Sequence, residues 1–397
     1  MRPLRRNRNF QLLWIGQVLS DLGSQIGALA YPLLVLALTR SPAVAGLVGT
    51  VASLAAFAVR LPAGALADRV DRRSAMIACD AVRAAALALL AALVLAHDAT
   101  WPLVLAVAVV DRIGDTLFSP AATAALPLIV DDEQLEPAWA ATEARQYAAN
   151  LGGPALGGLL FGLGRAVPFV ADAVSYAVST LTSAGLEGDF RPQREEERRG
   201  LWTEALDGLR LLWRDRLLRT VLIQAPLINF AFNGSIFTVT IGLRRHGASA
   251  AVIGVAQAVI MAGGLVGAVL APRIQRRVSI QQSIVLLAVG GGLMFGLAAL
   301  VMPSPLVALP LALPLLVSPA TNASLFAMLL RRTPEAMRGR VTNGLMQVAT
   351  GLAALSPLAS GVVVDQLSAR WAVALFALSL APVAVLAFVL PTETAGD

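Results

Sequence analysis

The segment Gly64-Ala-Leu-Ala-Asp-Arg-Val-Asp-Arg-Arg73 joins two long apolar stretches of the chain. A related segment, Gly267-Ala-Val-Leu-Ala-Pro-Arg-Ile-Gln-Arg-Arg277, stands in the second half, and its three arginines follow those of the first segment by 204 residues. Another pair, Pro154-Ala-Leu-Gly-Gly158 and Pro357-Leu-Ala-Ser-Gly361, is related by 203 residues. The sequence therefore predicts two repeated halves, an organisation that membrane transporters use to place substrate and ion sites between the halves.

The composition supports a membrane protein. Of the 397 residues, 57% are hydrophobic and only 14% are charged, whereas a soluble domain carries about a quarter charged residues. A soluble fold this apolar would expose large hydrophobic patches, and a disordered chain would contain far less apolar surface. These two classes are excluded.

The scarcity of cysteine, histidine and lysine excludes several kinds of functional site. The single cysteine, Cys79, excludes an internal disulfide framework, and two histidines are too few for most catalytic metal sites. Lysine is absent, so the chain has no nucleotide-binding loop that ends in Gly-Lys. We expect no cofactor, no metal and no enzymatic activity. Energy for any transport comes from a gradient, or transport is passive.

Apolar stretches of roughly 20 residues, the length that one helix needs to cross a bilayer, fill most of the chain. Breakers such as Ser41-Pro42 and Pro303-Ser304-Pro305 separate several of them. The sequence predicts an all-α membrane protein with twelve transmembrane helices. We expect these helices at residues 10–38, 43–67, 74–96, 101–126, 142–163, 167–187, 217–243, 250–271, 280–302, 304–328, 340–364 and 370–390.

The arginines predict the orientation. One set of connecting segments, which includes the amino terminus, contains 22 arginines, and the alternate set contains 5. Because cytoplasmic loops of membrane proteins are enriched in positive charge, the arginine-rich side is assigned to the cytoplasm. We therefore expect a multi-pass protein of the inner (plasma) membrane with both termini in the cytoplasm.

The polar stretch in the middle of the chain divides it into domains. We expect an N-terminal bundle of six helices over 1–187, a cytoplasmic linker over 188–216 and a C-terminal bundle of six helices over 217–397. The linker contains apolar residues near helical spacing, which predicts an amphipathic helix on the inner membrane surface. A soluble connector is the alternative. The apolar residues are Leu201, Trp202, Leu206, Leu209, Leu212 and Trp213.

Charged residues inside the predicted helices are expensive and mark functional positions. Asp21 lies about 17 Å along the first helix at 1.5 Å per residue, with no cation near it in sequence. A carboxyl group at that depth can take up and release a proton as its exposure changes, because burial disfavours its charged form. A structural aspartate bonded to a neighbouring helix is the alternative.

The densest group of charges lies on the fourth helix. Asp111 and Asp115 are four residues apart and share a face, and Arg112 can pair with Asp115 three residues later. Two acids beside one arginine leave one carboxyl group free to titrate. The alternative is a buried salt bridge, which is a weak stabiliser. These three residues and Asp21 are the predicted proton-coupling residues.

Other charges receive less weight. Asp80 and Arg83, on the third helix, are interpreted as a structural ion pair that borders the cytoplasmic opening. Arg60, Arg165 and Asp172 are placed near helix ends, from which they can reach the membrane surface.

The segment quoted first resembles a family signature. Gly64-x-Leu-x-Asp-Arg-x-x-Arg-Arg73 is similar to the turn between helices 2 and 3 of the major facilitator superfamily, and the second copy has Pro272 in the place of Asp68. The resemblance implies two six-helix bundles and a cytoplasmic gate in which the acid contacts the eleventh helix. An ordinary positively charged loop is the alternative. The implied gate residues are Gly64, Asp68, Arg69, Arg72, Arg73 and Arg340.

A second motif refines the resemblance. Gly153-Pro154-x-x-Gly157-Gly158 is similar to the motif that the superfamily associates with antiporters. Proline and glycines also predict a bent, closely packed helix, which membrane helices show widely. The segments 169–176 and 208–213 are similar to macrolide-efflux and siderophore-exporter types of drug:proton antiporter. In the superfamily an arginine on the fourth helix is tied to proton coupling, and Arg112 resembles it.

Polar residues inside helices usually face the bundle interior. We expect a largely apolar cavity with a few polar groups. The candidate lining residues are Gln25, Tyr31, Gln146, Asn150, Asn229, Phe232, Asn233, Gln257, Met261, Asn322 and Gln347.

Together these features predict a secondary active transporter that exports lipophilic drugs or a secreted small metabolite by alternating access, in exchange for protons. A passive or cation-coupled uniporter or importer and a lipid or lysolipid flippase remain alternatives. A membrane receptor or scaffold has no need of charges at the midplane. The expected partners are a small lipophilic or amphiphilic substrate, protons and the lipid bilayer. Nucleic acid is not expected, because the arginines lie in short clusters between apolar stretches, and we expect a monomer.

Overall fold

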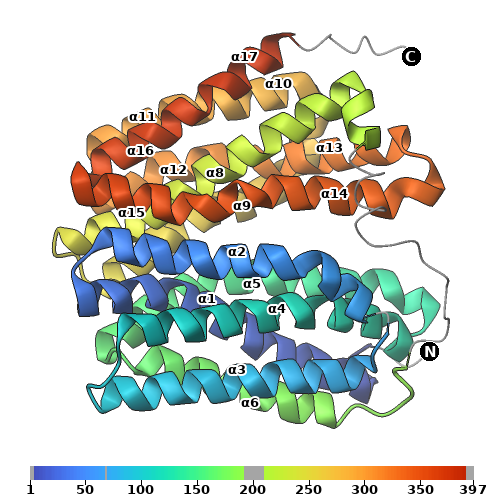
Figure 1. Ribbon diagram of the computed structural model, residues 1–397. Helices are drawn as coiled ribbons and strands as arrows, with labels where there is room; N and C mark the ends of the chain where they lie inside the picture. Colours follow the sequence, from blue (N-terminus) through green and yellow to red (C-terminus); the bar gives the residue numbers. More distant parts are fainter. Residues whose placement is uncertain (1–3, 68, 192–209, 390–397) are drawn as a thin grey trace. The chain divides into compact units, whose positions relative to one another are not determined.

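The computed structural model describes residues 4–67, 69–191 and 210–389, and within these ranges every regular element is a helix. The predicted amphipathic helix of the linker falls mostly on residues 192–209 and lies outside the described residues. Asp68 of the predicted gate also lies outside them. Figure 1 shows the helices in chain order.

The first half of the chain forms long, continuous helices that match the predicted spans to within a few residues, except that α5 begins at Leu135, seven residues before its predicted start. Their ends follow local signals: the Asn7 side chain accepts a hydrogen bond from the Phe10 amide, and the Asp71 side chain accepts one from the Ser74 amide at 2.7 Å. The elements are η1 (Leu4–Arg6), α1 (Arg8–Thr39), α2 (Pro42–Ala67), α3 (Arg72–Leu95), α4 (Trp101–Ile129), η2 (Asp132–Gln134), α5 (Leu135–Leu163) and α6 (Val167–Ala184).

The second half is more interrupted, because prolines and glycines break several spans into consecutive segments. One π-helical turn, η3, separates α10 from α11. The elements are α8 (Arg216–Arg245), α9 (Ala250–Arg277), α10 (Ile280–Val285), η3 (Leu286–Gly290), α11 (Gly291–Val301), η4 (Pro305–Val307), α12 (Ala308–Leu315), α13 (Ser318–Arg332), η5 (Glu335–Met337), α14 (Arg338–Gly351), η6 (Ala353–Leu355), α15 (Ser356–Gln366), α16 (Ala369–Ser379) and α17 (Ala381–Val389).

Nine helical segments in the described part of the chain are long and apolar enough to cross a membrane. This finding supports a multi-pass membrane protein. The long helices α4, α5 and α6 fall outside the nine. These three helices supply most of the charged groups of the site described below.

The chain divides into two compact units. One comprises Met1–Arg40, Val51–Arg198 and Ser249–Ala258, and the other comprises Ser41–Thr50, Arg199–Ala248 and Val259–Asp397. Each unit thus includes the first turns of one helix from the other half of the sequence, α9 in the first unit and α2 in the second. The boundary at residue 198 falls within the predicted linker.

In the first unit, α1 packs against α4, α5 and α6, and α3 packs against α4 and α6. Close approach of α1 and α6 depends on small residues of α1: a Cβ added at Gly16 or Gly23 would collide with side chains of α6. In the second unit, α8 packs against α14, α15, α16 and α17. Both patterns are helix-on-helix packing around an interior that can accept polar groups.

The helix around Pro154 is closely packed, as predicted, and the repeated segment at Pro357 packs in the same way. In the first unit, an added Cβ at Gly158 would meet the carbonyl oxygen of Ala250, and one at Gly254 would meet that of Pro154. The second unit has the matching contacts: Gly361 faces the carbonyl oxygen of Pro42, and Gly46 faces that of Pro357. The sequence repeat therefore extends to a repeated pair of backbone contacts.

Candidate functional site

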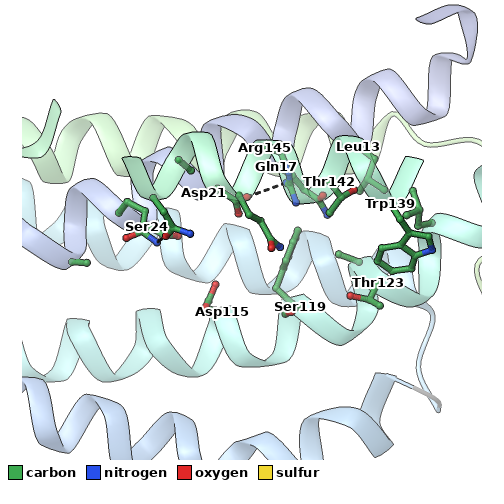
Figure 2. A pocket seen from close by; sticks show the side chains of 18 of the residues that line it. Leu13, Gln17, Asp21, Ser24, Asp115, Ser119, Thr123, Trp139, Thr142 and Arg145 are labelled. Atoms are coloured by element: carbon green, nitrogen blue, oxygen red, sulfur yellow. Dashed lines mark hydrogen bonds and ion pairs between the residues drawn. The ribbon is translucent and has the colours of Figure 1, made fainter. Parts of the chain in front are cut away.

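A cavity of about 330 Å³ lies within the first unit, between α1, α4 and α5. Figure 2 shows the side chains that project into it, most of which are polar. The expected largely apolar lining is wrong for this cavity, because all three helices turn hydroxyl, amide and charged groups toward it. Phe118, Trp139 and a few aliphatic side chains supply the apolar remainder.

An ion pair stands on the cavity wall. The Nη1 atom of Arg145, on α5, lies 3.4 Å from the Oδ2 atom of Asp21, on α1 (Figure 2). The Asp21 side chain is 32% exposed and the Arg145 side chain is 5% exposed. Asp21 therefore has a cation, which comes from a helix 124 residues further along the chain.

The two charged residues that α4 contributes to the wall behave differently from the prediction. Asp115 pairs with Arg83 of α3, its Oδ1 atom lying 3.6 Å from Nη2. Arg112 is exposed, and no carboxylate of the described residues lies within 4.0 Å of it. The predicted pair between Arg112 and Asp115 is therefore wrong, because α4 presents Asp111 and Asp115 to α3 and turns Arg112 away.

Arg83 is the central cation of a second, buried group of charges. Its Nε donates to Asp111 Oδ1 at 2.9 Å, and its Nη1 lies 3.6 Å from Asp80. Its Nη2 also donates to the hydroxyl of Tyr176. The centroid of the Tyr176 ring lies 3.9 Å from the guanidinium carbon of Arg83. The Arg83 side chain is 2% exposed. The expected ion pair of Asp80 and Arg83 is therefore present, and Arg83 also binds residues of α4 and α6.

Local sequence explains how Arg83 reaches α4. Gly114 lies between the two acids of that helix, and an added Cβ there would lie 2.7 Å from Cγ and Cδ of Arg83. The arginine stem therefore crosses α4 at a glycine. Asp111 and Asp115 share this face, as their spacing predicts, and Arg83 is the arginine beside them.

Asp172, on α6, belongs to the same buried group. The expectation that Asp172 reaches the membrane surface is wrong, because the residue is 0% exposed. Ser175 Oγ donates to its Oδ1 atom at 3.3 Å. Gly23 and Gly27 of α1 leave the space that its carboxyl group occupies. We name the group of Asp80, Arg83, Asp111 and Asp172 the buried acidic cluster.

Of the four predicted cavity residues on α1 and α5, three line the cavity and one does not. Gln25, Gln146 and Asn150 line the cavity, and Gln25 Nε2 donates to Asn150 Oδ1 at 2.7 Å. Tyr31 does not line it. Its hydroxyl donates to Asp111 Oδ2 at 3.4 Å, and its ring packs against Phe169 with centroids 5.4 Å apart. Tyr31 therefore belongs to the surroundings of the buried acidic cluster.

The other predicted cavity residues lie on α8, α9, α13 and α14. Asn229 and Asn233 donate to carbonyl oxygens one turn earlier in α8, at 3.0 and 2.9 Å. Phe232 packs edge-on against Phe295. None of these three residues lines the cavity described above. The same holds for the remaining candidates, Gln257, Met261, Asn322 and Gln347.

The predicted gate residues lie at the ends of α2, α3 and α14. Arg73 donates to the carbonyl oxygen of Ala184, and the Arg72 amide donates to that of Phe190 at 3.2 Å. At Gly64 no described heavy atom lies within 4 Å of an added Cβ. Arg69 follows α2, and Arg340 lies in the first turn of α14.

A family model described as "Major Facilitator Superfamily" matches residues 13–354. The chain belongs to this superfamily. It is 26% identical over 381 residues to the multidrug efflux pump Tap of Mycobacterium tuberculosis (strain ATCC 25618 / H37Rv), covering 92% of this chain and 89% of that protein. It is 31% identical over 180 residues to macrolide efflux protein A of Streptococcus pyogenes, covering 44% of each chain.

The fold of the superfamily is also found by structural comparison. The crystal structure of the nucleoside transporter NupG superposes with a TM-score of 0.74 at 17% identity, covering 96% of this chain and 98% of that one. Membership in a superfamily of transporters points to a non-enzymatic membrane transporter.

Sequence reasoning did not find Arg145, Arg83 or Asp172 as members of the site. A signal existed for two of them. Asp21 required a cation from another helix, and Arg145 lies beside the polar residues Gln146 and Asn150 on α5. Asp172 begins a polar stripe at helical spacing on α6, continued by Tyr176 and Ser179. Only packing reveals that Arg83 serves both α4 acids.

Proposed function

We propose that this transporter exports small drug-like molecules or a secreted metabolite across the inner membrane by alternating access, in exchange for protons. The observation that carries the proposal is the Asp21–Arg145 ion pair on the wall of a cavity inside the first unit. The efflux functions named for its relatives in Mycobacterium and Streptococcus support the direction of transport.

The chemistry of the pair suits proton exchange. An Asp21 carboxylate attracts either the Arg145 guanidinium or a cationic group of a substrate, and a protonated Asp21 attracts neither strongly. Substrate binding and proton binding therefore compete for one carboxyl group. Because Asp21 is about one-third exposed while Arg145 is almost fully buried, the aspartate is the partner that the cavity can reach.

The proposed architecture is that of two bundles of six helices, residues 1–187 and 217–397, with the linker 188–216 and both termini in the cytoplasm. The gate consists of Gly64, Asp68, Arg69, Arg72, Arg73 and Arg340. The close backbone contacts of Pro154 and Gly158 provide rigid surfaces for movement of one bundle against the other.

Purified protein in liposomes loaded with a pH-sensitive dye tests the proposal. We expect addition of ethidium or erythromycin to drive proton flux in the wild type and in the control Asp98→Asn, which changes an exposed loop acid. We expect Asp21→Asn to abolish that flux. Ethidium movement without proton flux in the wild type would instead indicate a uniporter. If neither probe moves while a fluorescent lysolipid does, the lipid-carrier alternative is correct.

A further inference from the structure

The buried acidic cluster contains more acid than base. Asp80, Asp111 and Asp172 are 0%, 6% and 0% exposed, and Arg83 is the cation among them. If all three acids were ionised, two negative charges would remain without a cation in an almost completely buried environment. A buried charge without a partner is so costly that such a group becomes neutral instead. The cluster must therefore hold protons.

The contacts identify the acid best placed to exchange one. Asp111 receives a charge-assisted hydrogen bond from Arg83 at 2.9 Å and another bond from Tyr31. Asp80 lies within ion-pair distance of Arg83, although neither of its carboxyl oxygens has a hydrogen-bond partner. In the described part of the chain, no guanidinium lies within 4.0 Å of Asp172, and its Oδ2 atom has no hydrogen-bond partner. Asp172 is thus the acid of the cluster for which the described residues supply no cation within ion-pair distance.

Two residues connect this cluster to the cavity. Ser24 lines the cavity, and its hydroxyl also lies 2.8 Å from that of Tyr176 and accepts from Arg83 at 3.3 Å. Asp115 lines the cavity as well and pairs with Arg83 from that side. Figure 2 shows both residues at the cavity wall. Arg83 therefore touches the buried acids and the cavity wall at the same time.

We propose that Asp172 is a second proton-carrying group of the transporter, and that one cycle exchanges a substrate for two protons, one bound at Asp21 and one at Asp172. The inference rests on the proposed function. When Asp172 releases its proton, the nearest available cation is Arg83. A shift of Arg83 toward Asp172 weakens its pair with Asp115 and leaves that carboxylate free to face a cationic substrate.

The groups that face Asp172 are consistent with this exchange. From its own helix Ser175 donates to Asp172 and Tyr176 lies one turn away, and Tyr31 of α1 also lies near it. Helix α3 contributes Arg83, with Asp80 paired to it, and α4 contributes Asp111. These groups comprise one cation, two other acids and three hydroxyls, so Arg83 is the group that can compensate the negative charge when Asp172 loses its proton.

The first test measures stoichiometry. Full-length protein in liposomes is given opposing pH and potassium–valinomycin gradients, and the gradient at which net ethidium flux stops gives the number of protons per ethidium. We expect two for the wild type and for Asp98→Asn, and one for Asp172→Asn. Asparagine keeps the volume of the side chain and cannot carry the proton. An unchanged ratio in Asp172→Asn, or a wild-type ratio of one, would overturn the inference.

The second test does not require a transporting variant. Infrared difference spectra of the reconstituted protein between two pH values report the carbonyl stretch of protonated carboxyl groups. We expect Ser175→Ala, which removes the donor to Asp172 Oδ1, to shift one such band. The matched control Ser183→Ala removes a buried hydroxyl two turns further along α6 and leaves the bands unchanged. Identical spectra for the wild type and Ser175→Ala would count against Asp172.

The two proposals fail in different ways. Absence of substrate-driven proton flux in the wild type refutes the proposed function, and the inference falls with it. If the wild type shows substrate-driven proton flux but Asp172→Asn leaves the ratio of protons to ethidium unchanged, only the inference is refuted. Asp21→Asn loses flux altogether, because the competition in the cavity that drives proton release then disappears.

Discussion

The Asp21–Arg145 pair and the buried acidic cluster are built from the same residue types but differ in charge balance and access. The pair has one acid and one base, and its acid is about one-third exposed to the cavity. The cluster has three buried acids around one base, Arg83, which is 2% exposed. Opening the pair leaves one acid that the cavity can reach, whereas loss of the cation from the cluster leaves several buried acids unpaired.

This difference separates two tasks within one bundle of helices. A balanced, accessible pair is suited to compete with a substrate. An acid-rich, inaccessible cluster is suited to store a proton and to hold α3, α4 and α6 together through Arg83 and Tyr176. Substitutions that act on one region and leave the other intact test whether the division is real.

Arg83→Met is expected to have the largest effect. Removal of one partner of a buried ion pair costs about 3–5 kcal/mol, because the other charge is left without compensation, and Arg83 is shared by Asp80, Asp111 and Asp115. We expect a large drop in the melting temperature of the detergent-purified protein and in its yield. Thermal unfolding followed by size-exclusion chromatography measures both.

The pair provides the contrast for Arg83→Met. Arg145→Met removes a cation that serves one partly exposed acid, so its melting temperature should lie clearly closer to that of the wild type. If the two arginine variants were equally destabilised, the distinction between cluster and pair would have no energetic basis. A second substitution, Asp111→Asn, should recover part of the loss in Arg83→Met.

Gly114→Ala is expected to have an intermediate effect confined to the cluster. A methyl group there would lie 2.7 Å from the stem of Arg83, so the arginine must move away from Asp111 and Asp115. Overpacking of this kind costs about 1–3 kcal/mol. The measurement is again the melting temperature, together with ethidium-driven proton flux.

The matched control for that change is Gly152→Ala on α5, where no described heavy atom lies within 4 Å of an added Cβ. Alanine is also the better helix former, so this variant should match or slightly exceed the stability of the wild type. A loss of stability in Gly152→Ala comparable to that in Gly114→Ala would mean that the contact with Arg83 is not the cause.

Hydropathy and breakers located the helices well, because a bilayer requires long apolar stretches and prolines interrupt them in recognisable places. Helical spacing also predicted correctly that Asp111 and Asp115 share a face. The close packing at Pro154 and Gly158 followed from the same local reasoning, since glycine at that spacing admits another backbone.

The partners of the charges could not be found this way, since they depend on which helices are neighbours. Spacing within α4 allowed Arg112 to pair with Asp115, yet the neighbouring α3 supplies Arg83 to the opposite side of that helix. Asp21 likewise pairs with a residue on a helix that is distant in sequence. Asp172 was misjudged because proximity to a predicted helix end says nothing about the neighbours that cover it.

Arg112→Gln is expected to have the smallest effect, and it tests the arginine that the family resemblance had favoured. Arg112 is exposed at the cavity wall, and no carboxylate of the described residues lies within 4.0 Å of it. Surface substitutions of this kind usually change stability by no more than about 0.5 kcal/mol. Proton flux should persist, and the apparent affinity for ethidium should change by less than about tenfold, which corresponds to about 1.4 kcal/mol. Loss of proton flux in Arg112→Gln with an unchanged melting temperature would instead place the coupling cation on α4, and Arg83 would then serve only to hold the helices together.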